Sequence, residues 1–140
     1  MAALFVVDCS LAAKWILPEP GHAVAVELYE QYAAGEIRLI APDLLLTEFA
    51  SLLAKRFRRK QLSAAHCNRA FDLMRSSVRG MVDTQPRLAT ALALALAQHI
   101  SLWDSVYLAV AREYDCPLAT ADARLARAAK GTKTEIVLVQ

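Results

Sequence analysis

The sequence alternates short apolar segments, each of β-strand length, with longer segments that carry apolar residues at helical spacing. The strand-like segments are residues 4–7, 37–41, 78–82, 117–120 and 135–139. The helix-like segments between them are residues 10–17, 22–34, 43–60, 63–76, 86–99, 102–114 and 122–129. Strands separated by helices favour a mostly parallel α/β sheet with helices on both faces and right-handed crossovers. We expect four to five strands, because the pattern at 78–82 is weak.

Local signals place several boundaries of these elements. Four residues are expected helix N-caps, whose side-chain oxygens accept a backbone N–H of the first turn: Ser10, Ser63, Ser101 and Asp122. Pro42 is expected to open the helix that follows it. The alanine- and leucine-rich segment 88–97 has a composition that favours a buried helix.

Length and composition limit the class of protein. The 140 residues are expected to form a single domain, residues 1–140. The hydrophobic fraction of 56% suggests either a sheet that is well covered on both faces or an apolar face reserved for a partner, and self-association is a fair expectation. The longest apolar run, 88–97, is too short to cross a bilayer, and this predicts a soluble protein without a membrane role. The first residues lack a secretory signal, which favours a cytoplasmic location.

Four acidic residues stand where the predicted fold would gather them: Asp8, Glu48, Asp104 and Asp122. Asp8 and Asp122 follow two strands, at the sheet edge where open α/β sheets bind ligands. Glu48 and Asp104 lie on apolar helices, where an unpaired carboxylate is costly to desolvate. Four such charges about 4 to 6 Å apart would repel by several kcal/mol without a cation. The pattern predicts a divalent-metal site.

The residue types around these acids suggest which ion they bind. No cysteine or histidine stands at ligand spacing to them, and oxygen-only ligands select Mg²⁺ or Mn²⁺. The hydroxyls of Ser10 and Thr120 lie beside the strand-end acids, where they can orient a carboxylate or bound water. Each acid also has an ordinary alternative. Asp8 and Asp122 can be plain N-caps, while Glu48 and Asp104 can lie at the solvent edge of their helices.

A second cluster is basic and lies near the end of the helix predicted at 43–60. It consists of Lys55, Arg56, Arg58, Arg59 and Lys60. The net charge of +2 is too small to indicate nucleic-acid binding by itself, but a local cluster can hold several RNA phosphates. Cations also complement the dipole at a helix C-terminus, so a solvated helix end explains the cluster equally well.

Four runs of residues, in this order, resemble the PIN-domain ribonucleases, and among them the VapC-type toxins. The runs are residues 6–10 with Lys14 and Trp15, 41–48, 103–109 and 118–125. They span nearly the whole chain. Three positions differ mildly from the family pattern, at Cys9, Trp103 and Ser105, and no carboxylate is missing.

The resemblance implies a three-layer α/β/α fold and metal-dependent endonucleolytic cleavage of RNA. It also implies homodimerisation, or a higher homo-oligomer, and inhibition by a small cognate antitoxin. Residue by residue, Asp8, Glu48, Asp104 and Asp122 match the catalytic and metal-binding acids of the family, and Thr120 matches the hydroxyl beside the last acid.

Other functions remain open on the sequence alone. An RNA-processing paralogue would carry the same motifs as a toxin. An interaction module without catalysis would use the apolar helices to bind a partner. An aspartate-based phosphoryl-transfer or receiver domain also places acids at strand ends, but the first strand here ends in Asp-Cys-Ser without an adjacent acidic pair or Asp-x-Asp.

Overall fold

A parallel sheet forms the centre of the computed structural model, which describes all residues, 1–140. The sheet has five strands in the order β3-β2-β1-β4-β5, and every neighbouring pair is parallel. The strands are β1 (Ala3–Val7), β2 (Ile37–Pro42), β3 (Gly80–Val82), β4 (Leu118–Thr120) and β5 (Ile136–Leu138). The predicted parallel sheet of four to five strands is confirmed, including the weak strand β3.

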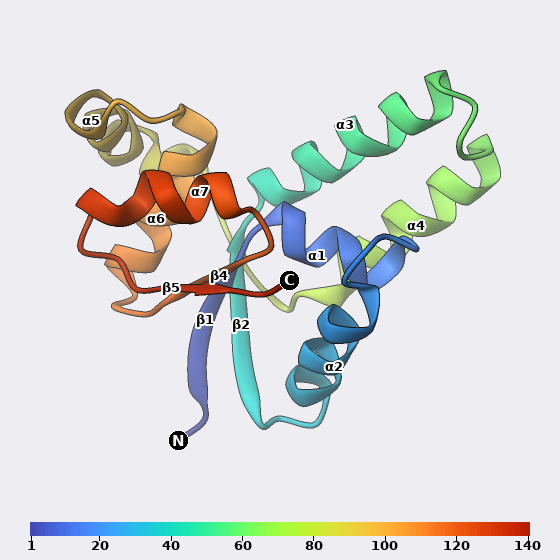
Figure 1. The fold of residues 1–140 in the computed structure, drawn as a ribbon, viewed down its shortest axis with the longest axis horizontal. Coiled ribbons are helices and arrows are strands. Elements are labelled where there is room, and N and C mark those ends of the chain that lie inside the picture. Colours follow the sequence, from blue (N-terminus) through green and yellow to red (C-terminus); the bar gives the residue numbers. More distant parts are fainter.

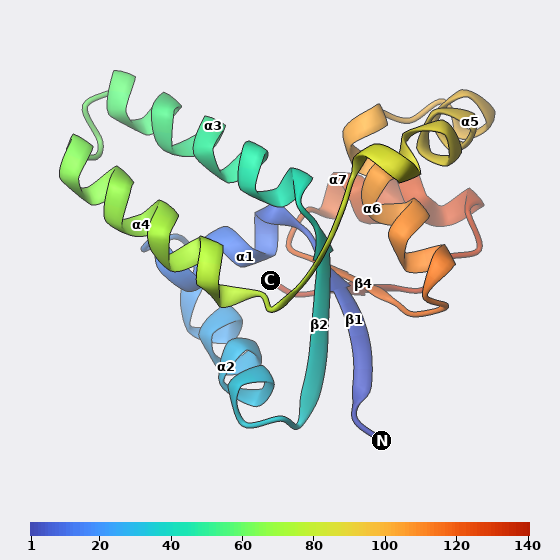
Figure 2. The same cartoon turned by 180° about the vertical axis from the view of Figure 1, so that it is seen from behind.

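Seven α-helices cover the two faces of the sheet. Four of them lie on one side in Figures 1 and 2: α1 (Cys9–Ile16), α2 (His22–Ala33), α3 (Leu44–Arg58) and α4 (Ala64–Ser77). Three lie on the other side: α5 (Leu88–Gln98), α6 (Leu102–Glu113) and α7 (Ala123–Ala128). This three-layer α/β/α arrangement follows from the right-handed crossovers between parallel strands.

The direction of the chain across the sheet reverses between β1 and β4. The chain runs outward from β1 through β2 to β3, then returns past β1 to β4 and β5. β1 pairs with β4 through Val6 opposite Leu118 and Val7 opposite Ala119. The carboxyl ends of β1 and β4 therefore lie side by side at a topological switch point, where parallel α/β sheets bind their ligands.

The core is built mainly from the central strands and α6. Val6 and Val7 of β1 are fully buried, as is Leu118 of β4. Every residue of α6 from Asp104 to Ala111 is buried. Phe49 of α3 is also fully buried, and it brings the start of that helix against the core. The ends of β1 and β4 and the acid-bearing turns of α3 and α6 thus belong to one packed unit.

Three sequence predictions differ from the structure. Asp8, not Ser10, is the N-cap of α1, because its carboxylate accepts the Leu11 N–H while Ser10 already lies inside the helix. Pro42 is the last residue of β2 and does not open α3. α5 forms at the expected place but is not buried, since only Ala91 and Leu94 of that helix are covered.

The remaining predicted caps are confirmed. Ser63 accepts the N–H of His66, Ser101 accepts that of Asp104, and Asp122 caps α7. Cys9, Cys67 and Cys116 are free thiols of intermediate burial. None of the helices combines the length and the apolar character needed to span a membrane.

Candidate functional site

Asp8 lies directly after β1 and is only 4% exposed. Its carboxylate accepts hydrogen bonds from the Ser10 hydroxyl at 2.8 and 3.0 Å, from the Thr120 hydroxyl at 2.6 Å and from the Leu11 N–H at 3.1 Å. Burial raises the pKa of Asp8 to about 6, the negative charge of Asp122 adds to this effect, and the hydrogen bonds oppose it. The carboxylate is therefore held rigidly in a position where its charge is costly.

Ser10 and Thr120 hold Asp8 in place, because their hydroxyl groups link the residues that follow β1 to the end of β4. Their hydroxyl oxygens lie 3.1 Å apart. The Ser10 oxygen also accepts the Ala121 N–H at 3.1 Å, and the Thr120 oxygen accepts the Asp122 N–H at 3.0 Å. These bonds connect the first turn of α1 to the loop after β4. Both hydroxyls contact the Asp8 carboxylate, and each also accepts a backbone N–H of the loop after β4.

Glu48 points toward the same region from the second turn of α3. The Tyr107 hydroxyl of α6 donates a short hydrogen bond to Oε1 of Glu48. Burial raises the pKa of Glu48; the bond from Tyr107 lowers it, and the charges of Asp8 and Asp104 raise it again. Glu48 is half-buried and so borders the core, as the helical spacing indicated.

Asp104 and Asp122 are joined by one guanidinium group. Asp104 is 8% exposed and stands in the first turn of α6. Nη1 of Arg124 lies 2.9 Å from Oδ2 of Asp104, and Nη2 lies 3.1 Å from Oδ2 of Asp122. The other oxygen of Asp122 caps α7 by accepting the N–H groups of Arg124 and Leu125. Both carboxylates are thus compensated by the same side chain.

The four predicted acids therefore come from β1, α3, α6 and the loop after β4 and face a common region. The charge of Asp122 raises the pKa of Asp8, those of Asp8 and Asp104 raise the pKa of Glu48, and Asp104 and Asp122 share Arg124. No three His, Cys, Asp or Glu side chains are placed to share one ion in this arrangement. The donor set nevertheless fits a hard cation, because it consists of carboxylate and hydroxyl oxygens alone.

The basic cluster does not join the acids. α3 and α4 form a hairpin that extends away from the sheet, and the cluster occupies its tip (Figure 1). Ten residues of helix separate Glu48 from Arg58, about 15 Å along the axis. Lys55, Arg58, Arg59 and Lys60 are exposed, whereas Arg56 forms an ion pair with Glu19. The predicted RNA-binding residues thus lie on a surface separate from the four acids, and one of them, Arg56, is already paired with Glu19.

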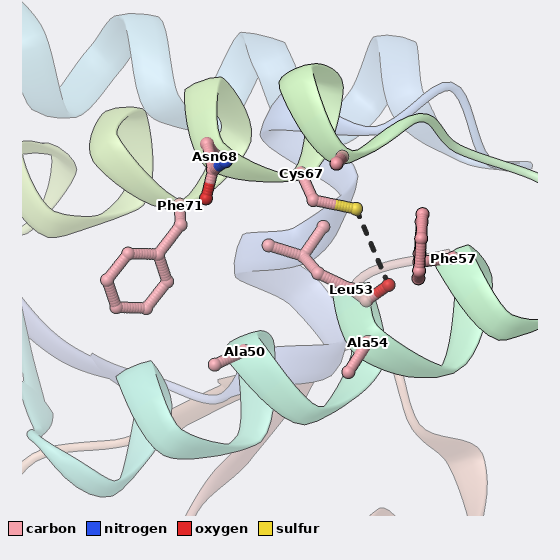
Figure 3. A pocket seen from close by; sticks show the side chains of 8 residues that line it. Ala50, Leu53, Ala54, Phe57, Cys67, Asn68 and Phe71 are labelled. Carbon is pink, nitrogen blue, oxygen red and sulfur yellow. Dashed lines mark hydrogen bonds between the residues drawn. The ribbon is translucent and has the colours of Figure 1, made fainter.

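An apolar groove of about 280 Å³ lies between the two helices of this hairpin. Figure 3 shows Phe57 of α3 and Phe71 of α4 on its walls, with the thiol of Cys67 donating to the Leu53 carbonyl at 3.6 Å. Phe57 is 52% exposed, which is unusual for a large aromatic side chain in a monomer. We name this surface the hairpin groove, lined by Ala50, Leu53, Ala54, Phe57, Ala64, Cys67, Asn68 and Phe71.

The sequence did not single out Tyr107 and Arg124 as parts of the site. Tyr107 follows Asp104 by three residues, so both lie on one face of α6. Arg124 follows Asp122 by two residues in the first turn of α7. These spacings were visible signals, but the partners Glu48 and Asp104 lie on other elements of the chain.

Comparisons with known proteins agree with this arrangement. A sequence model of the PIN domain matches residues 5–131. Ribonuclease VapC1 of Mycobacterium tuberculosis is 32% identical over 100 residues, which cover 71% of this chain and 74% of that protein.

Solved structures share the fold at lower identity. PAE2754 from Pyrobaculum aerophilum has a TM-score of 0.73 and 23% identity, covering 97% of this chain and 84% of that one. Mycobacterium tuberculosis VapC20, a sarcin-ricin loop cleaving toxin, has a TM-score of 0.67 and 19% identity, with coverages of 90% and 95%. A toxin-antitoxin complex from Klebsiella pneumoniae has a TM-score of 0.65 and 14% identity, with coverages of 97% and 98%. With its acids at the switch point and a family match over most of its length, the chain belongs to the PIN domain family.

Proposed function

We propose that the protein is a metal-dependent endoribonuclease that hydrolyses RNA phosphodiester bonds at the site formed by Asp8, Glu48, Asp104 and Asp122. The observation that carries this proposal is the convergence of these four carboxylates at the switch point of the sheet. Burial, with a smaller contribution from neighbouring acids, raises the pKa of Asp8 and Glu48, and a cation relieves that cost. The 32% identity to a protein named ribonuclease supports the choice of RNA as substrate.

Mg²⁺ or Mn²⁺ is the proposed cofactor, held by Asp8, Asp104 and Asp122, with Glu48 as a further ligand or a ligand through water. When bound, such an ion lowers the pKa of a coordinated water and neutralises charge that grows on the scissile phosphate. Ser10 and Thr120 keep the two oxygens of Asp8 in fixed directions. Their hydroxyls thereby prepare one ligand position before the ion arrives.

Glu48 is suited to a further role. Its pKa lies above the ordinary value and it is half-buried beside Asp8 and Asp104. A carboxylate with a raised pKa is a better proton acceptor near neutral pH. Glu48 Oε2, the oxygen that Tyr107 does not contact, is available to accept a proton from the attacking water.

The test is cleavage of a labelled RNA by the purified protein with Mg²⁺, with Mn²⁺ and with a chelator. We expect cleavage only with a metal, and a loss of about 100-fold or more in Asp8→Asn. Asp72→Asn is the matched control, because Asp72 is an exposed aspartate of α4 away from the site, and it should cleave normally. Full activity with chelator, or in the Asp8 variant, would contradict the proposal.

We also propose that the protein is a toxin with a small antitoxin partner. Solved structures of this fold include toxin-antitoxin complexes, and the hairpin groove offers an exposed apolar surface suited to apolar side chains of a partner helix. Co-expression with the product of a short neighbouring reading frame tests this, and binding should protect RNA from cleavage. A neighbouring gene of another type would favour an RNA-processing role.

The hairpin groove also supports a second candidate, an interaction module without catalysis. Under that function the groove would bind its partner while RNA stays intact at every metal concentration. The cleavage assay described above separates the two candidates.

Self-association is the last part of the proposal. Leu92 and Leu96 of α5 are 51% and 69% exposed, and Leu88 lies on the same face. Such a leucine stripe is suited to packing against a second copy, giving a homodimer. Sedimentation of Leu92→Glu against the unchanged protein tests this: the variant should sediment as a monomer, and an unchanged species would exclude α5 as the interface.

A further inference from the structure

Arg124 is the one cation that forms an ion pair with any of the four acids. Its guanidinium contacts both oxygens of Asp104, at 2.9 and 3.5 Å, and one oxygen of Asp122, at 3.1 Å. Its backbone is fixed at the same time, because the Arg124 N–H donates to Asp122 at 2.9 Å in the cap of α7. The side chain is therefore tethered at the rim of the site.

The pairing is asymmetric in burial. The side chain of Asp104 is 12% exposed and that of Asp122 is 30% exposed, whereas that of Arg124 is 61% exposed. The guanidinium thus compensates a buried carboxylate while it stays largely hydrated. Ion pairs with one well-hydrated partner are weak, so the guanidinium can leave at low cost.

The oxygens that Arg124 contacts belong to the acids proposed to bind the divalent ion. A guanidinium and a metal ion cannot occupy the same carboxylate oxygens together, because their positive charges repel at such separations. No three acidic side chains are placed to share an ion while the Arg124 pairs are present. Release of Arg124 would let the Asp104 and Asp122 side chains turn toward Asp8.

We propose that Arg124 is an internal competitor for the metal site: it neutralises Asp104 and Asp122 in the metal-free protein and is displaced when the divalent cation binds. This inference rests on the proposed metal-binding function of the same acids. Arg124 thereby sets the cation concentration at which the site is loaded.

The test is Mn²⁺ binding by isothermal titration calorimetry, without RNA and at an ionic strength of about 0.15 M, where distant surface charges are screened. Arg124→Gln should bind Mn²⁺ about tenfold more tightly than the unchanged protein, since a competing interaction has been removed. Arg127→Gln is the matched control. Arg127 lies on the same helix, is exposed and forms no ion pair, so this variant changes the net charge equally and should bind within about twofold of the unchanged protein. Arg124→Lys retains the charge without the planar guanidinium, so its Mn²⁺ affinity should fall between those of the unchanged protein and Arg124→Gln.

Equal affinity in Arg124→Gln and the unchanged protein would overturn the competition, and so would weaker binding, which would mean that Arg124 organises the carboxylates. Equal tightening in Arg127→Gln would reduce the effect to net charge and overturn it as well. Cleavage of RNA by the unchanged protein distinguishes these failures from failure of the proposed function. If no variant binds Mn²⁺ and no metal supports cleavage, both proposals fall together.

Discussion

Tyr107 donates a hydrogen bond to Glu48 across 59 positions of sequence, and this bond joins α6 to α3 at the acidic site. Tyr107 is 2% exposed, so its ring is fixed by the core and its hydroxyl has a fixed position. The bond stabilises the ionised form of Glu48 against the raising effect of burial. Tyr107 thus acts as a positioning residue for Glu48.

Tyr107→Phe should move the acidic limb of the pH profile for RNA cleavage to higher pH, because Glu48 loses the bond that favours its charged form. The ring and its packing remain, so the free energy of unfolding should fall by only about 1 kcal/mol. Cleavage rates from pH 5 to 9, together with urea unfolding, provide the measurements. A profile that falls equally at every pH would indicate a purely structural role for Tyr107.

Asp8 should make the metal-free protein less stable as the pH rises. Its pKa is about 6 in the folded protein against 3.8 ordinarily, so between these values the folded state holds a proton that the unfolded chain has released. The free energy of unfolding therefore falls through this window, by on the order of 2 to 3 kcal/mol for this group. Below pH 4 the stabilisation is fully present, and above pH 6 it is lost.

Asp8→Asn should remove this dependence. In urea unfolding with chelator from pH 4 to 7.5, the variant should match the unchanged protein near pH 4 and exceed its stability at pH 7.5. Parallel curves for the two proteins would show that burial of Asp8 carries no such cost.

Divalent metal should raise the melting temperature through Asp104. At a Mg²⁺ concentration 100 times the Kd, binding to the folded state adds about 2.7 kcal/mol, roughly 5 to 10 °C for a domain of this size. Asp104→Asn should lose that increase. Its metal-free melting temperature should stay close to that of the unchanged protein, because loss of the pair with exposed Arg124 is balanced by removal of a buried charge. Asp72→Asn should keep the full increase, and a normal increase in Asp104→Asn would remove Asp104 from the site.

The basic tip of the hairpin should contribute to RNA affinity without base specificity. Replacing Arg58 and Arg59 together by glutamine should weaken binding of single-stranded RNA and lower the salt slope by about 1.4, or 0.7 for each phosphate contact. Arg56→Gln should act differently, because Arg56 is paired with Glu19. It should lower stability by less than about 1 kcal/mol and leave the salt slope unchanged. Filter binding over a range of NaCl concentrations measures the salt slopes of both variants. Equal slopes in both variants and the unchanged protein would mean that the basic cluster only complements the dipole of the helix end and does not bind RNA.

Much of the fold was predictable because its signals are local. The alternation of strand and helix segments gave the parallel sheet, and Ser63, Ser101 and Asp122 cap the expected helices. The burial of α5 was predicted wrongly for a physical reason. A helix composed almost entirely of alanine and leucine has no polar face to mark its exposed side, and only its packing on α6 decides which leucines are covered.

The sequence by itself determined that Asp8 and Asp122 follow two parallel strands and that Glu48 and Asp104 lie on apolar helices, because strand ends and helical periodicity are properties of neighbouring residues. Only the tertiary structure decided that Tyr107 meets Glu48 and that Arg124 meets Asp104. These contacts depend on where the crossovers place one element beside another, and no spacing within a single element specifies that placement.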